Sequence, residues 1–122
     1  MLGLSGATRI LLFISATDMR KGFDGLSTLV MAAGEDLYSG HLFVFVSRRR
    51  DRAKILTFQK GGLVLWYKCL DRGVYRIPLR IPAGIPCVKA TRRELELLLE
   101  GINRRTLTAG RRTAKLRRRT ES

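Results

Sequence analysis

The sequence has few of the residues that build metal or disulfide sites. It contains one histidine, His41, and two cysteines, Cys69 and Cys87. A site built on paired histidines is therefore excluded, and without a CxxC pair the cysteines make poor zinc ligands. We expect two structural thiols in a reducing compartment, with no bound metal and no cofactor.

The motifs of common enzyme classes are also absent. There is no GxxxxGK[ST] segment for nucleotide phosphates and no GxSxG segment for a nucleophilic serine. A two-metal nuclease would need three carboxylates that converge on the metal ions, and the best candidates are Asp18, Asp51 and Asp71. Each has a simpler explanation as a helix cap, a partner of neighbouring arginines or a turn residue. We expect no catalytic activity.

Long hydrophobic runs are missing as well. No segment approaches the roughly 18 apolar residues of a membrane span, and the start of the chain lacks the basic region of a secretion signal. These observations predict a cytoplasmic protein that makes no use of a membrane.

Negative charge is scarce, and the excess of positive charge is unevenly distributed. The 122 residues include 24 Lys and Arg against 10 Asp and Glu, a formal net charge of +14. Such an excess indicates a polyanionic partner, nucleic acid before an anionic membrane surface. Residues 104–122 hold eight basic side chains and one acidic, with little apolar surface to bury. We predict one domain over residues 1–103 and a basic, disordered tail over 104–122. The tail's candidate DNA-binding residues are Arg104, Arg105, Arg111, Arg112, Lys115, Arg117, Arg118 and Arg119.

The first part of the domain reads as a strand followed by a helix. The run "RILLFI" (9–14) suits a buried strand, and Thr17 or Asp18 could cap a helix over about residues 19–33. Arg20 and Lys21 would then lie on its exposed face and contact a partner. The alternative for "DMRKGFDG" (18–25) is a glycine loop that grips phosphate, which the continuous apolar stripe disfavours. Glycines inside a helix also suggest a close approach by another backbone or a partner at Gly22 or Gly25.

The remainder of the domain predicts a sheet and a second helix. Four β-prone runs follow at 41–46, 53–59, 63–70 and 74–79, joined by connections of hairpin length. Prolines then mark an extended connection up to "TRRE", where Thr91 and Glu94 form a capping box for a helix that ends at Gly101. The pattern predicts an α+β fold, an antiparallel meander of four to five strands with two helices on one face.

The first predicted hairpin has a strongly basic tip. Within "SRRRDRAK" (47–54) a single acid, Asp51, accompanies five cations that repel one another unless a partner neutralises them. A charged hairpin can track a phosphate backbone, although charged tips are often only solvated. We predict DNA binding by Arg48, Arg49, Arg50, Arg52 and Lys54.

Five ordered segments carry a resemblance to a known family. They are "DMRKGFDGL" (18–26), "SGHLFVF" (39–45), "RRRDRAKIL" (48–56), "GLVLWYKCLDRGVYRIP" (62–78) and "LLLEGI" (97–102). Together they resemble the TnpB-type accessory protein of three-gene bacterial insertion sequences, which is unrelated to the RNA-guided nuclease of that name. The resemblance implies co-encoded partners, a transposase and a small helix-turn-helix protein. It supplies no catalytic residues.

These observations lead to a functional hypothesis with two alternatives. We expect a non-enzymatic accessory protein for DNA transposition, which binds DNA through its basic hairpin and tail and contacts the transposase. The alternatives are a protein-only factor for transposase assembly and a small RNA-binding protein.

Overall fold

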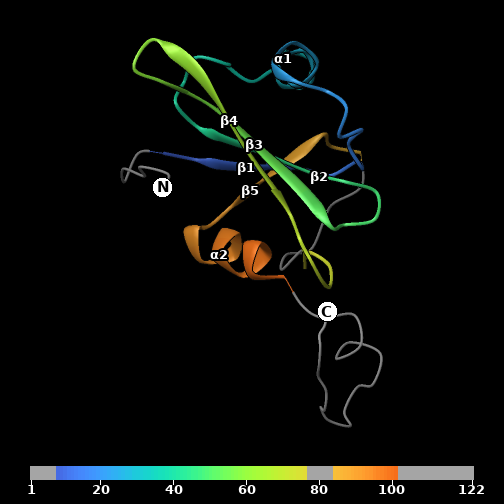
Figure 1. Ribbon diagram of the computed structural model, residues 1–122. Coiled ribbons are helices and arrows are strands. Elements are labelled where there is room, and N and C mark those ends of the chain that lie inside the picture. The colour runs from blue at the N-terminus through green and yellow to red at the C-terminus, as the bar shows by residue number, and fades with distance from the viewer. Residues whose placement is uncertain (1–7, 77–83, 102–122) are drawn as a thin grey trace, which may run out of the picture.

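A computed structural model of the protein describes residues 8–76 and 84–101. It is a five-stranded sheet with one helix on each face (Figure 1). The strands are β1 (Ile10–Phe13), β2 (Leu42–Val46), β3 (Arg52–Gln59), β4 (Gly62–Cys69) and β5 (Cys87–Ala90), and the helices are α1 (Phe23–Ala32) and α2 (Arg92–Glu100). The α+β class is confirmed.

The order of the strands is β4-β3-β2-β1-β5, which differs from a meander. Strand β1 lies parallel to β2, with Ile10 opposite Leu42, and the other neighbouring pairs are antiparallel. Two parallel strands need a crossover connection, and α1 supplies it. The predicted all-antiparallel meander is therefore wrong at β1.

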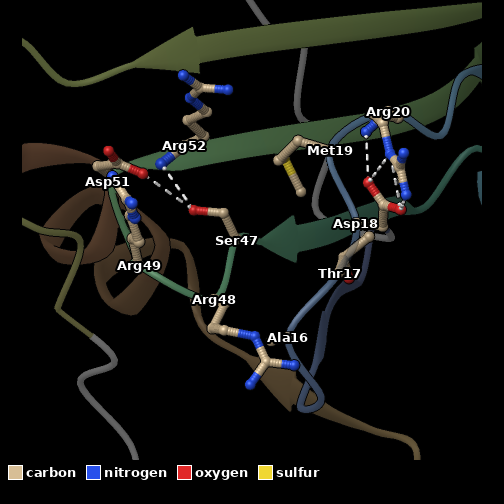
Figure 2. A pocket seen from close by; sticks show the side chains of 10 residues that line it. All are labelled: Ala16, Thr17, Asp18, Met19, Arg20, Ser47, Arg48, Arg49, Asp51 and Arg52. Carbon is tan, nitrogen blue, oxygen red and sulfur yellow. Dashed lines mark hydrogen bonds and ion pairs between the residues drawn. The ribbon is translucent and has the colours of Figure 1, made fainter.

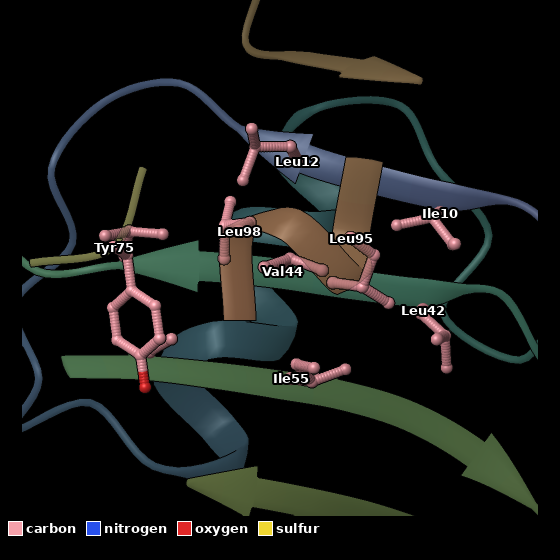
Figure 3. Packing of buried hydrophobic residues seen from close by; sticks show 10 residues of the cluster. Ile10, Leu12, Leu42, Val44, Ile55, Tyr75, Leu95 and Leu98 are labelled. Carbon is pink, nitrogen blue, oxygen red and sulfur yellow. The ribbon is translucent and has the colours of Figure 1, made fainter. Parts of the chain in front are cut away.

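The two helices cover opposite faces, so the prediction that both lie on one face is wrong. Successive side chains of a strand point to opposite faces, and both faces of β1 and β2 are buried. Leu95 and Leu98 of α2 pack on one face in a cluster that includes Tyr75 (Figure 3). Leu26 and Val30 of α1 pack on the other face. A run such as "LFVFV" is apolar throughout because it separates two cores.

The fourth predicted strand does not form in the part of it that the structure describes. Only Val74 makes a bridge, and residues 77–79 lie outside the described ranges. The Tyr75 side chain is instead fully buried in the core, and its backbone N–H donates to the Arg50 carbonyl. Strand β5, which the prolines led us to treat as a connection, pairs instead with β1 at the sheet edge.

The helix predicted over residues 19–33 begins later than expected. Helix α1 starts at Phe23, and its N-cap is Gly22, which has no side chain to cap the helix. The predicted caps Thr17 and Asp18 therefore do not cap it. The close approach expected near the glycines comes from within the chain, because a Cβ on Gly25 would lie 3.0 Å from the Lys21 Cβ. The helix over residues 92–100 forms as predicted, with its capping box complete and Gly101 at its end.

Candidate nucleic-acid interface

The parallel pairing of β1 and β2 places the segments that follow them at the same edge of the sheet. Both strands end there, and the Thr17 N–H donates to the Val46 carbonyl at 2.9 Å, which ties the two segments together. In sheets with parallel strands, the carboxyl ends of the strands are a common place for ligand sites because the connecting loops diverge there.

A pocket of about 630 Å³ lies between these two segments (Figure 2). We call it the arginine pocket because four of its ten lining residues are arginines, accompanied by two aspartates. Its lining residues are Ala16, Thr17, Asp18, Met19, Arg20, Ser47, Arg48, Arg49, Asp51 and Arg52. With more arginines than aspartates, the lining is net positive.

Residues 18–21 form a turn whose geometry depends on the Asp18 carboxylate. The Lys21 N–H donates to the Asp18 carbonyl at 3.1 Å, and the Arg20 N–H donates to Asp18 Oδ1 at 2.9 Å. An aspartate that accepts from the backbone two residues later is a common turn former. The sequence signal for this turn competes with the signal for a helix cap, and the turn prevails here.

The same carboxylate holds the Arg20 guanidinium. Arg20 Nη2 donates to Asp18 Oδ2 at 2.8 Å, and Arg20 Nε lies 3.1 Å from both carboxylate oxygens. These side-chain hydrogen bonds, followed by the backbone bond, lower the pKa of Asp18 to about 2. Asp18 is therefore ionised at neutral pH and orients a guanidinium whose Nη1 takes no part in these bonds.

Lys54 fixes this turn to the sheet from the side of β3. Its ammonium donates to the Met19 carbonyl at 2.8 Å and to the Lys21 carbonyl at 2.7 Å, and it lies 4.8 Å from the centre of the Tyr67 ring. Only 8% of Lys54 is exposed. Lys54 is therefore away from the hairpin tip where we expected it, and we omit it from the proposed DNA-binding residues.

The loop between β2 and β3 is organised around Ser47. The Ser47 N–H donates to the Arg52 carbonyl at 2.9 Å, and the Ser47 carbonyl accepts from the Arg50 N–H at 2.9 Å. Ser47 Oγ donates to Asp51 Oδ1 at 3.2 Å and accepts from the Arg52 N–H at 3.1 Å. Arg50 adopts the left-handed conformation, at φ 61°, as hairpin loops of this length often require.

The segment after β4 is hydrogen-bonded to the loop between β2 and β3. The Leu70 N–H donates to the Asp51 carbonyl at 2.7 Å, and the Tyr75 N–H donates to the Arg50 carbonyl. The Tyr75 hydroxyl donates to the Lys68 carbonyl at 3.0 Å, and burial raises its pKa to about 12. The phenol thus stays protonated as a donor, and the loop is attached to the core at two backbone positions.

The structure brings together part of the predicted set. Arg20, Arg48, Arg49 and Arg52 line the arginine pocket, although Arg20 was expected to contact a partner from the exposed face of a helix. Arg50 and Lys21 are exposed next to the residues that line it. Their roles in binding stay predictions. The eight basic residues of the tail lie outside the described ranges.

Sequence reasoning missed the two acidic members of the pocket. Asp18 was interpreted as a helix cap and Asp51 as a local partner of arginines, whereas each holds the geometry of one wall. Parallel pairing of β1 and β2 could have indicated their proximity, because a strand, a helix and a second strand form a typical crossover unit.

Other site types find no support in the described residues. In residues 8–76 and 84–101 there is no group of three or more His, Cys, Asp and Glu side chains placed to hold a metal. The free cysteines Cys69 and Cys87 belong to the two edge strands β4 and β5. Within the same ranges, no helix is long and apolar enough to cross a membrane.

Comparison with known proteins identifies the family. A family model described as IS66 Orf2 like protein matches residues 8–109. An uncharacterized protein of Sinorhizobium fredii, y4jC, is 32% identical over 104 residues, which are 84% of this chain and 86% of that protein. No solved structure matches. The family match spans the sheet, both helices and the arginine pocket. The chain therefore belongs to the IS66 Orf2-like family, which is linked to the transposition of insertion sequences in an accessory role.

Proposed function

We propose that this protein is a non-enzymatic accessory factor of transposition that binds DNA at the arginine pocket and the adjoining hairpin. The observation that carries the proposal is the convergence of Arg20 with Arg48, Arg49 and Arg52, from two segments far apart in sequence. Planar guanidinium groups suit phosphate recognition because they donate parallel hydrogen bonds.

The charge arrangement favours an anionic ligand over an internal structural role. Arg48 makes no hydrogen bond or ion pair within residues 8–76 and 84–101, and it is exposed. Arg20 is 91% exposed although Asp18 orients it. Arginines gathered at one edge without a matching number of carboxylates repel one another, and a phosphate backbone would relieve that repulsion.

The proposal is tested by a gel-shift titration of the full chain at two salt concentrations. The three probes are the terminal repeats of the element, a random duplex and RNA of equal length. Preference for the terminal repeats is the expected result. Preference for RNA would favour the RNA-binding alternative, and no binding to any probe would favour the protein-only assembly factor.

A charge-matched pair of variants locates the site. Arg48→Gln combined with Arg49→Gln removes two charges from the arginine pocket, whereas Lys60→Gln combined with Lys89→Gln removes two exposed charges elsewhere. We expect the first pair to weaken binding to the terminal repeats more than to random duplex, by about 1–3 kcal/mol for each interaction with a base that the variant removes. Equal effects of the two pairs would contradict the assignment.

The tail is proposed to add affinity without selectivity. Each cation that neutralises a phosphate contributes about −0.9 to the slope of log affinity against log salt. Deleting residues 104–122 should therefore reduce the magnitude of that slope by roughly 4–7 and weaken binding to all DNA sequences alike. An unchanged slope would show that the tail is not in contact with DNA.

We also propose contact with the co-encoded transposase, through the exposed side of α1 and the turn before it. Phe23 and Met31 of α1 are 46% and 57% exposed, and Lys21 is exposed next to them in sequence. Calorimetric titration of transposase into wild type and into Met31→Ser with Lys21→Ala tests this. Unchanged affinity in the variant would rule out this surface.

A further inference from the structure

The size of the arginine pocket exceeds what contact with a phosphate backbone requires. A duplex backbone can lie along a flat or convex surface, where single side chains reach its phosphates. A volume of about 630 Å³ falls instead in the range of about 300–1,000 Å³ that is typical of sites for small molecules. A group with the bulk of one nucleotide, rather than a phosphate alone, matches this space.

The lining is suited to both halves of a nucleotide. Arg20 and Arg48 supply guanidinium groups for a phosphate, and Ala16 and Met19 supply apolar surface beside them. Arginine planes stack on bases in proteins that bind single strands, and apolar side chains flank bases that are flipped out of a duplex. Figure 2 shows the Arg48 side chain extending toward Ala16, so that charged and apolar walls face the same space.

The walls are held in place before any ligand arrives. Lys54 fixes the turn that carries Asp18 and Arg20, and Ser47 fixes the loop that carries Arg48. A preorganised site loses less conformational entropy when it binds, which favours a defined ligand over loose electrostatic attraction.

We propose that the arginine pocket binds one unpaired nucleotide of DNA, with its phosphate on the arginines and its base against Ala16 and Met19. The inference rests on the proposed DNA binding and deepens it by naming the substrate class. A base within a duplex is stacked and paired, so only a nucleotide in a single strand, in an overhang or flipped out of the helix can enter.

The test measures fluorescence anisotropy of the full chain with three labelled DNAs, a blunt duplex, the same duplex with a three-nucleotide overhang, and a single strand. Charge density alone favours the duplex. We expect the overhang and the single strand to bind more tightly than the blunt duplex by about fivefold or more, because a base of the blunt duplex must first be unpaired and unstacked. Competition by a deoxynucleoside monophosphate should exceed competition by inorganic phosphate at equal concentration.

A variant that fills the pocket without changing its charge separates the contribution of the base from that of the phosphate. Ala16 is exposed and lines the pocket, so the larger side chain of Ala16→Leu would occupy the space proposed for the base. It should remove the preference for unpaired DNA, so that the overhang and the single strand bind no more tightly than the blunt duplex. Ala32→Leu, on the exposed side of α1, is the matched control and should retain the preference. Circular dichroism and the melting temperature show whether each variant is folded.

The outcomes separate this inference from the proposed function. Equal wild-type affinity for blunt and unpaired DNA, or equal competition by phosphate and the monophosphate, would overturn the nucleotide site while leaving DNA binding in place. These two readouts need no variant, so they decide the question even if Ala16→Leu does not fold. Absence of binding to all three DNAs would overturn both.

Discussion

Helices α1 and α2 start in different ways, and the contrast shows how the arginine pocket arises. Helix α2 starts where its own sequence dictates, because Thr91 Oγ1 accepts from the Glu94 N–H at 3.0 Å and Glu94 Oε1 accepts from the Thr91 N–H at 2.8 Å. Helix α1 starts at Phe23, later than its apolar stripe suggests.

The reason for the late start of α1 lies in tertiary contacts. Lys54 binds two carbonyls of the turn before α1, and Asp18 binds Arg20 within that turn. The residues that could have formed another helical turn instead form one wall of the pocket. Residues within α2 determine where α2 begins, whereas contacts from the distant strand β3 determine where α1 begins.

The largest effect is expected when the contact that delays α1 is removed. Lys54→Met should destabilise the protein by about 3 kcal/mol, because hydrogen bonds from a charged group contribute about 1.5–3 kcal/mol each and methionine retains most of the apolar volume. Chemical denaturation measures this destabilisation. Hydrogen exchange at the Arg20 and Lys21 amides should also become faster, because the turn loses the ammonium that holds the Met19 and Lys21 carbonyls.

The control for this change is Lys89→Met on the edge strand β5, where the lysine is exposed. A surface change of this kind should stay within about 0.5 kcal/mol of wild type. A similar small effect from Lys54→Met would mean that the turn does not depend on Lys54.

A second change tests the end of α2. Gly101 has φ 69°, and a Cβ there would lie 2.8 Å from Leu70 Cδ1 and 3.1 Å from the Val74 carbonyl oxygen. Gly101→Ala should therefore cost about 2 kcal/mol, since left-handed strain and the clash act together. The melting temperature measures this change. Gly84→Ala, also at positive φ but with open space around it, should cost less.

A third change weakens the start of α2 while leaving α1 alone. Thr91→Ala removes the capping oxygen and should destabilise the protein by about 1 kcal/mol. Thr91→Ser keeps the oxygen and should recover most of that stability. DNA affinity should stay at the wild-type value in both variants, because Thr91 is not among the residues that line the pocket. Weaker DNA binding in Thr91→Ala would connect α2 to the site.

The sequence predicts well what depends on neighbours in the chain. Three features follow from residues within a few positions of one another. They are the capping box of Thr91 and Glu94, the hairpin at 47–52 and the end of α2 at Gly101. Sequence prediction fails where a contact between distant segments determines the local structure. Three such contacts join segments far apart in the chain: the parallel pairing of β1 with β2, the hydrogen bonds of Lys54 to the turn before α1, and the hydrogen bond of the Tyr75 N–H to the Arg50 carbonyl.

The smallest expected effect concerns the titration of Asp18. Its pKa is about 2 because Arg20 donates to the carboxylate, below the ordinary value of 3.8. Any stability from this pair is therefore fully present above pH 3.8 and is lost as the pH falls through about 2. Carboxyl NMR should show the pKa of Asp18 near 2 in wild type and closer to 3.8 in Arg20→Gln. No change in Arg20→Gln would mean that another group holds the carboxylate.

The central claim is that the turn after β1 and the loop after β2 form one DNA site, and a double-mutant cycle tests it most directly. Affinities for terminal-repeat DNA are measured for wild type, Arg20→Gln, Arg48→Gln and the double variant, with Lys89→Gln paired to Arg20→Gln as the independent control. The account predicts that the double variant loses less affinity than the product of the two single losses, by about twofold or more, the mark of coupled neighbours. Losses that multiply for Arg20 and Arg48, as they should for Arg20 and Lys89, would show that the two arginines act at separate places and would contradict the account.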